Sequence, residues 1–170
     1  WDGKAFLSAI DADSEGEEGK FYVWKKEEVE KILGQDAAVF CNYYDISEKG
    51  NWHEGHGATE IKNILRVKKT LTDFSKEVKM DAAAIAVILE RSRQKLLAAR
   101  NKRVRPATDD KIILGWNALM NTACCKAYAA TGNKLYQKMA IENMQFLLSV
   151  FSVSTENESL HHTWKAGKAH

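Results

Sequence analysis

Two helical patterns joined by a tight turn constrain the fold of this chain more than any other part of the sequence. Residues 111–131 repeat apolar side chains at helical spacing, and this pattern predicts a buried face made of Ile112, Trp116, Leu119, Met120, Ala123 and Ala127. Residues 134–151 do the same with Tyr136, Ala140, Met144, Leu147 and Phe151. Because only Thr131-Gly132-Asn133 separates the two, the helices must lie nearly antiparallel, which predicts an αα-hairpin.

The remaining sequence is also typical of a mainly α fold, since the chain has one proline in 170 residues. The patterns predict helices over 26–33, about 36–44 and about 81–101. Gly34 is expected to end the first of these, and Thr72 to cap a further short helix. Residues 45–63 hold three glycines and few apolar side chains, which indicates a long loop. Short strands are expected at 21–24 and 160–164.

The charges are distributed unevenly, although the formal net charge is only +2. Residues 1–60 carry 6 basic and 14 acidic side chains, whereas residues 61–105 carry 13 basic and 4 acidic ones. Such blocks occur in nucleic-acid-binding surfaces and also in two segments that pair with each other. We favour pairing, because the basic block lacks interleaved aromatic side chains, and we expect no nucleic acid as a partner.

Several classes of protein are excluded by what the sequence lacks. The longest apolar run, 82–89, is shorter than the roughly 20 residues that a membrane span needs, so no membrane partner is expected. No basic segment followed by an apolar one opens the chain, and we expect a cytoplasmic protein. Cys41, Cys124 and Cys125 form neither a C-x-x-C motif nor a zinc spacing. We expect Cys124 and Cys125 to pack as small apolar side chains, without redox chemistry.

Two local patterns match metal sites only in part. Residues 11–16 supply acids at positions 1, 3 and 5 of a calcium loop and Gly16 at position 6, but Tyr22 stands where that loop needs a glutamate. His53 and His56 lie three residues apart in a glycine-rich loop, without the helical register of a zinc-binding H-E-x-x-H motif. We therefore expect no metal and no other cofactor.

Asp109 and Asp110 stand at the predicted start of the first long helix, directly after Thr108. One explanation is structural, because Thr108 or Asp109 can accept hydrogen bonds from the first backbone amides of a helix. The other is functional: two carboxylates followed by Trp116 and Asn117 supply acids, a stacking surface and hydrogen bonds for a ligand. We expect one carboxylate to cap the helix and the other to line a site.

Three blocks of the sequence resemble those of a known family. They are FLSAIDADSEGEEGKFYVW at 6–24, Gly50-Asn51, and RPATDDKIILGWNALM at 105–120. In order and spacing they are similar to the YyaL and spermatogenesis-associated protein 20 family over nearly the whole chain. Ala118 departs from the pattern, since the family usually has glycine there.

The resemblance implies a fold. Members of the family have a thioredoxin-like domain followed by a helical region similar to six-hairpin (α/α) toroids, the architecture of several glycoside hydrolases and of N-acylglucosamine 2-epimerase. We therefore expect residues 1–170 to form one part of the toroid region, about half of the six hairpins, with short β segments in the loops and without the thioredoxin-like domain. A partial toroid leaves apolar helix faces open, so we expect the chain to associate with itself.

The resemblance also implies a carbohydrate ligand. We favour hydrolase-like over epimerase-like chemistry, because an epimerase needs a base, often His, and no His lies in a matching block. A glycoside hydrolase needs two facing carboxylates, and the candidates are one of Asp11, Asp13 and Glu15 with one of Asp109 and Asp110. The candidate ligand-binding side chains are Trp24, Trp116 and Asn117. The alternative is a non-catalytic module that binds a ligand or a protein, with its acids paired to basic residues of 61–105.

Overall fold

The computed structural model describes residues 1–52, 61–152 and 159–170, which form two compact units. The four-helix unit comprises Ala12–Pro106, and the hairpin unit comprises Trp1–Asp11 together with Ala107–His170. Helices make up about half of the chain and the strands are short, which confirms a mainly α fold with short β segments. The partial toroid and the single domain stay predictions.

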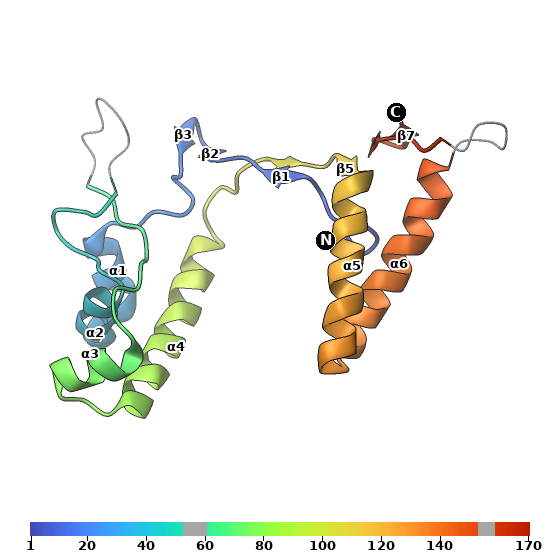
Figure 1. Ribbon diagram of the computed structural model, residues 1–170. Coiled ribbons are helices and arrows are strands. Elements are labelled where there is room, and N and C mark those ends of the chain that lie inside the picture. Colours follow the sequence, from blue (N-terminus) through green and yellow to red (C-terminus); the bar gives the residue numbers. More distant parts are fainter. Residues whose placement is uncertain (53–60, 153–158) are drawn as a thin grey trace. The chain divides into compact units, whose positions relative to one another are not determined.

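The four-helix unit contains α1 to α4 and a 3₁₀ turn, η1 (Figure 1). Their bounds are Lys26–Leu33 for α1, Gly34–Asp36 for η1, Ala37–Tyr43 for α2, Leu71–Val78 for α3 and Ala82–Arg100 for α4. These bounds confirm the three helices predicted ahead of residue 102. The cap predicted at Thr72 is wrong: Thr70 caps α3, because its Oγ1 accepts a hydrogen bond from the Asp73 amide at 3.1 Å.

One apolar cluster joins the four helices. Its buried members come from every helix and from the residue ahead of α1: Trp24, Val29, Leu33, Phe40, Phe74, Ile85, Leu89 and Leu96. Each of the shorter helices packs against α4. Helices of about eight residues are marginal alone in water, while burying one large apolar side chain contributes about 1.5–3 kcal/mol. The shared cluster therefore stabilises them.

A tight β-hairpin precedes α1. β2 (Asp13–Ser14) and β3 (Glu17–Glu18) pair in antiparallel fashion around Glu15 and Gly16. Both turn residues have positive φ, 56° and 78°, as a two-residue hairpin loop requires. The strand predicted at 21–24 is wrong, because only Trp24 there forms a bridge, with Asn63.

The acidic and basic blocks of the sequence pair within the four-helix unit, which confirms that interpretation of the charges. Asp36 is buried and accepts a hydrogen bond from Arg91 Nε at 2.6 Å, and the bond to Arg91 lowers the pKa of this carboxyl. Asp45 contacts Lys68 at 2.7 Å and Arg66 at 2.6 Å. In each pair the acid comes from residues 1–60 and the base from 61–105.

The hairpin unit contains α5 (Leu114–Thr131) and α6 (Lys134–Phe151), which pack side by side (Figure 1). Gly132 ends α5 in the left-handed conformation with a φ of 67°, and the Asn133 side chain accepts a hydrogen bond from the Leu135 amide at 3.0 Å. These features confirm the predicted αα-hairpin and its turn.

Short strands complete the hairpin unit. β1 (Ala9–Ile10) pairs with β4 (Thr108–Asp109). β5 (Ile112–Ile113), β6 (Thr163–Lys165) and β7 (Lys168–Ala169) form a three-stranded sheet. The strand predicted at 160–164 therefore begins later, at Thr163, and Leu160 forms only an isolated bridge with Ser152.

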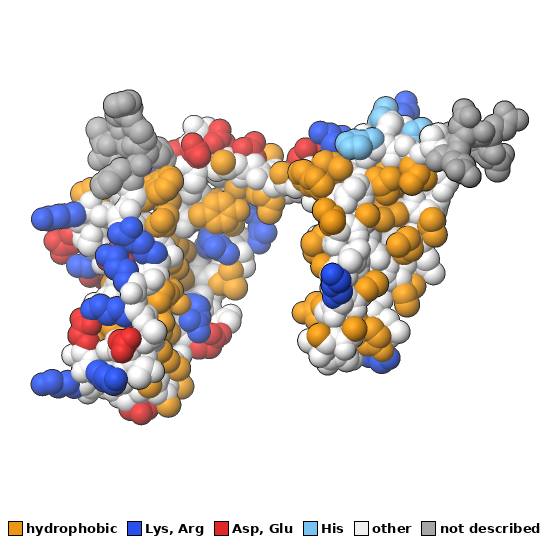
Figure 2. All heavy atoms as spheres, in the orientation of Figure 1, with side chains coloured by type: hydrophobic (Ala, Val, Ile, Leu, Met, Phe, Trp, Pro, Cys, Tyr) orange, Lys and Arg blue, Asp and Glu red, His pale blue; other side chains and the backbone are white. Residues whose placement is uncertain are grey.

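The predicted buried face of α5 is largely wrong. Trp116, Leu119 and Met120 are 54%, 72% and 41% exposed, while Asn117, Asn121 and Cys124 are buried. On α6, Ala140, Leu147 and Phe151 are buried as expected, but Met144 is exposed. Much of the hairpin-unit face seen in Figure 2 is therefore covered by hydrophobic side chains.

The asparagines form the contact between the two helices. Asn121 Nδ2 donates to the Ala140 carbonyl at 2.7 Å, and Asn143 Nδ2 donates to Asn117 Oδ1 at 3.0 Å. Amides can be buried when their hydrogen bonds are made. Helical periodicity locates apolar stripes, but it does not reveal polar side chains that satisfy one another.

Candidate functional site

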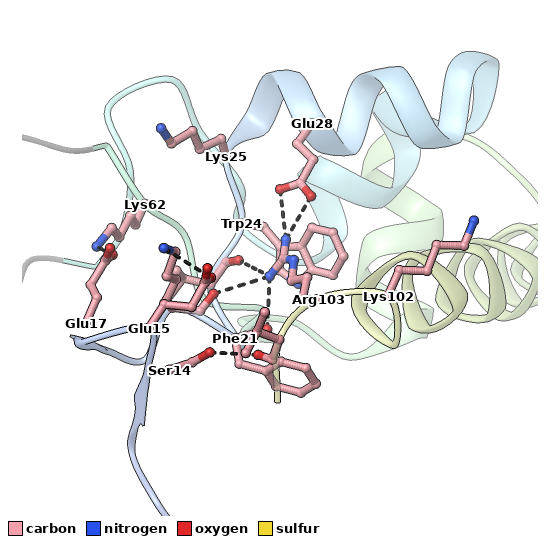
Figure 3. A pocket seen from close by; sticks show the side chains of 13 residues that line it. Ser14, Glu15, Glu17, Phe21, Trp24, Lys25, Glu28, Lys62, Lys102 and Arg103 are labelled. Atoms are coloured by element: carbon pink, nitrogen blue, oxygen red, sulfur yellow. Dashed lines mark hydrogen bonds and ion pairs between the residues drawn. The ribbon is translucent and has the colours of Figure 1, made fainter. Parts of the chain in front are cut away.

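A pocket of about 540 Å³ lies within the four-helix unit, between the β2–β3 hairpin, the segment ahead of α1 and the residues that follow α4 (Figure 3). Five basic, three acidic and four apolar side chains line it, together with Ser14. The described residues of the lining therefore have a formal net charge of +2.

Lys62 reaches the pocket from a backbone that is held by close contacts. The amides of Asn51 and Trp52 both donate to its carbonyl at 3.1 Å. A β carbon at position 50 would lie 2.6 Å from the same oxygen, so only Gly50, with a φ of 71°, allows this approach. The Asn51 side chain exchanges two hydrogen bonds with the Ile64 backbone. The Gly50-Asn51 block thus positions Lys62.

Lys62 and Glu17 form the most buried ion pair of the pocket. Lys62 is 6% exposed, and its ammonium contacts the Glu17 carboxylate. The hydrogen bond from Lys62, helped by the charges of Lys62, Lys20 and Lys25, lowers the pKa of Glu17. A buried ammonium requires such a partner, because removing it from water is costly. Glu17 is therefore an ionised, structural carboxylate.

Glu15 and Lys20 form a second pair, with 3.2 Å between Oε2 and Nζ. Their side chains are 48% and 42% exposed, respectively. Exposed ion pairs of this kind contribute about 0–1 kcal/mol. This contact can therefore open at little cost.

Arg103 joins the end of α4 to the segment ahead of α1. Its guanidinium donates to both oxygens of Glu28 at 2.8 Å, and to the carbonyls of Phe21 and Val23 at 2.9 and 2.8 Å. It also lies over the Trp24 ring, 4.1 Å from the ring centre. These contacts engage the guanidinium, so Arg103 shapes the pocket wall.

The structure distributes the predicted site residues between the two units. Glu15 and Trp24 line the pocket, and Asp13 lies in β2 of the same unit. The others belong to the hairpin unit: Asp11, Asp109, Asp110, Trp116 and Asn117. The facing carboxylates that a hydrolase needs would require acids from both units, so that pairing stays a prediction.

Asp109 and Asp110 do not cap α5. The N-cap residue is Ile113, without a side-chain hydrogen bond, because Ile112 and Ile113 form β5 instead of a first helical turn. Asp109 Oδ1 accepts a hydrogen bond from the Lys111 amide at 3.1 Å, which lowers the pKa of Asp109. Asp110 Oδ1 lies 2.9 Å from Lys165 Nζ. The predicted capping role is therefore wrong.

Trp116 and Asn117 differ in accessibility. Trp116 is exposed on α5, whereas Asn117 is fully buried. The Asn117 amide joins the N-terminal segment to the hairpin, because it accepts from the Phe6 amide at 2.8 Å and donates to the Phe6 carbonyl at 2.9 Å. It donates to the Ile113 carbonyl as well. These bonds give Asn117 a structural role.

Sequence reasoning missed most residues of the pocket. Lys25, Lys62, Lys102 and Arg103 belong to no motif, Lys20 was not singled out within the block at 6–24, and these side chains come together only in the folded unit. The signal that points to them is the pairing of the acidic and basic blocks, since the ion pairs Lys62–Glu17 and Arg103–Glu28 join residues of different blocks.

The three thiols differ in burial. Cys41 and Cys124 are buried, and burial raises the pKa of both thiols. Cys125, expected to pack, is exposed, and its Sγ lies 3.8 Å from Asn121 Oδ1.

Two further tests concern metals and membranes. Across residues 1–52, 61–152 and 159–170, no group of three or more His, Cys, Asp or Glu side chains is arranged to hold a metal ion. His53 and His56 lie outside the described residues. None of the described helices has both the length and the apolar character needed to cross a membrane.

No family model matches this chain. It is 30% identical over 159 residues to an uncharacterized protein of Caenorhabditis elegans, covering 84% of this chain and 22% of that protein. It is 30% identical over 155 residues to human spermatogenesis-associated protein 20, covering 80% of this chain and 19% of that protein. The mouse protein of that name is 28% identical over 170 residues, 88% of this chain and 22% of its own length. The chain spans about a fifth of the length of these curated relatives.

Proposed function

This chain belongs to the spermatogenesis-associated protein 20 family, and we propose that its four-helix unit is a non-catalytic module that binds a small polar ligand, with carbohydrates as the first class to test. The observation that carries the proposal is the pocket of about 540 Å³. Small-molecule sites typically measure about 300–1,000 Å³ and place a few polar groups among apolar walls.

The state of the carboxylates supports binding without catalysis. A glycoside hydrolase needs one carboxyl group with a raised pKa as its acid and a second, accessible carboxylate. In the pocket Glu17 and Glu28 are paired with Lys62 and Arg103, and the pKa of Glu17 is lowered rather than raised. Hydrolase-like chemistry, which the family resemblance implies for a longer protein, depends instead on acids from both units.

Ligand binding can be tested by titrating the ¹⁵N-labelled chain with glucose, N-acetylglucosamine and glucuronate. We expect saturable shifts of the amide resonances of Ser14, Lys20, Trp24, Lys62 and Val104, which surround the pocket. Titrations that never saturate at these amides would contradict the proposal.

Two matched variants locate the site. Val104 and Val87 are exposed to a similar extent, 58% and 61%, but only Val104 lines the pocket. Val104→Trp should fill the pocket and abolish binding, whereas Val87→Trp on α4 should leave the affinity unchanged. Equal effects of the two variants would place the ligand elsewhere.

A further inference from the structure

Three lysines line one end of the pocket. Lys62 contacts Glu17, Lys20 contacts Glu15, and Lys25 lies at the same end (Figure 3). The charges of all three lysines act on the Glu17 carboxylate, which shows that they are close to it. We call Lys20, Lys25 and Lys62, together with Glu15 and Glu17, the lysine cluster.

The two carboxylates of the cluster differ in how firmly they are held. Glu17 neutralises a lysine that is 6% exposed, so removing it would leave a buried charge unpaired. Glu15 is at the tip of the β2–β3 turn, and 48% of its side chain is exposed. An exposed ion pair is among the weakest of protein interactions. Glu15 is thus the carboxylate that an incoming anion can replace.

We propose that the ligand of this pocket carries a carboxylate or phosphate group, which binds at the lysine cluster and takes the place of Glu15 beside Lys20. The inference rests on the proposed ligand-binding function and specifies the chemical class of the ligand. Glu15 then acts as an internal competitor, which occupies Lys20 in the free protein and swings into solvent when the anion binds. Lysine is suited to this exchange, because its ammonium is a point charge that binds phosphate and carboxylate without a fixed fork geometry.

The net charge of the lining supports the same class of ligand. Among the described residues of the lining, basic side chains outnumber acidic ones by five to three, and a positive potential of this kind attracts anions. Arg103 and Glu28 neutralise each other at the opposite wall, whereas three of the five basic side chains belong to the lysine cluster.

The test compares the dissociation constants of glucose, glucuronate, glucose 6-phosphate and inorganic phosphate for the 170-residue chain by calorimetry. We expect glucuronate and glucose 6-phosphate to bind about tenfold more tightly than glucose, a difference that 1.4 kcal/mol produces. Their affinity should fall as salt is added, because salt screens the lysines. Equal binding of glucose and glucuronate would overturn the inference and leave the ligand-binding function standing.

The remaining outcomes separate the two proposals. Inorganic phosphate that binds as tightly as glucose 6-phosphate would support the anion site and overturn the carbohydrate assignment. If none of the four compounds binds, the proposed function fails and the inference fails with it.

Two charge variants test the role of Glu15. Glu15→Gln removes the competitor and should tighten glucuronate binding several-fold. Lys20→Met should weaken glucuronate binding about tenfold. Lys31→Met, on an exposed part of α1 outside the pocket, is the matched control and should have no effect.

Circular dichroism of each variant confirms that it is folded. Weaker glucuronate binding by a folded Glu15→Gln variant would overturn the displacement, because it would mean that Glu15 contacts the ligand.

Discussion

The two units of this chain differ in which polar and apolar side chains they bury. The four-helix unit buries apolar residues from all of its helices and joins its charges in pairs at or near the surface. The hairpin unit buries three asparagines between α5 and α6 and exposes Trp116, Leu119 and Met120. The four-helix unit contains a charged pocket. The hairpin unit has apolar helix faces that no other described residue covers.

The comparison shows that the buried face of a helix cannot be predicted from its apolar positions alone. The polar residues between these positions have to be considered as well. In α4, Ile85, Leu89 and Leu96 are the apolar stripe and are also buried. In α5 the apolar stripe is exposed, because Asn117 and Asn121 find partners on α6 and in the N-terminal segment. We expect the two units to respond differently to substitutions of the same kind.

We expect the largest difference between the units in the free energy of unfolding when a large apolar side chain is replaced by alanine. Phe40→Ala empties a fully buried position in the four-helix unit and should lower the free energy of unfolding by about 3–5 kcal/mol. Leu119→Ala in the hairpin unit removes a side chain that is mostly in solvent and should change it by less than about 0.5 kcal/mol. Urea unfolding followed by circular dichroism measures both. Similar losses for the two variants would remove the distinction between the units.

The next effect concerns the buried amides of the hairpin unit. Asn117→Ala leaves the Phe6 amide and carbonyl without their side-chain partner and removes one of the hydrogen bonds of Asn143, and each buried group left unpaired costs about 1–3 kcal/mol. Thr122→Ala, an exposed position on the same helix, is the control and should be close to neutral. A neutral Asn117→Ala variant would show that water replaces these bonds.

Acid should weaken the four-helix unit more than the hairpin unit. Lys62, Arg91 and Lys68 lower the pKa values of Glu17, Asp36 and Asp45, respectively, through hydrogen bonds. A carboxyl whose pKa is lower in the folded state stabilises the protein above its unfolded pKa, and this stabilisation is lost as the pH falls through the folded value. The loss should therefore begin near the ordinary pKa values of 3.8 and 4.5 and continue below them.

Amide hydrogen exchange can be measured at neutral pH and at a pH below the ordinary carboxyl pKa values of 3.8 and 4.5. It reports the stability of the two units separately. Asp36→Asn should lose less stability on acidification than the unaltered chain, since one titrating pair is absent. An identical acid response of the two would show that the Asp36–Arg91 contact does not contribute.

Replacing exposed apolar side chains of α5 and α6 should have the smallest effect on stability. The same replacements should have a clear effect on self-association. We expect the chain to associate with itself through α5 and α6 at high concentration, because Leu119 and Leu148 are 72% and 62% exposed. Leu119→Lys combined with Leu148→Lys should reduce association while leaving the melting temperature nearly unchanged. Sedimentation velocity that shows only monomer for the unaltered chain would contradict this expectation.

Local signals in the sequence were sufficient for most of the helices. Gly34 and Gly132 end α1 and α5, and Asp81 caps α4, because these residue types suit those positions in any protein. The start of α5 was misjudged, since Ile112 and Ile113 pair with β6, a strand some fifty residues further along the chain. Pairing across such a distance has no local signature.

The site was predicted only in outline. The opposite charges of the two blocks indicated pairing, which Glu17–Lys62 and Glu28–Arg103 confirm. The identity of each pair depends on how Gly50 and Asn51 position Lys62, and on where α4 ends. Motif reasoning therefore selected Glu15 and Trp24 but not the lysines around them.

Hydrogen exchange measured by mass spectrometry with and without saturating glucuronate tests the central claim most directly, namely that the four-helix unit alone binds the ligand. We predict slower exchange in peptides that cover 12–25, 61–64 and 101–106, and no change in α5 and α6. Protection confined to 114–151, with none around Lys20 and Lys62, would contradict the account.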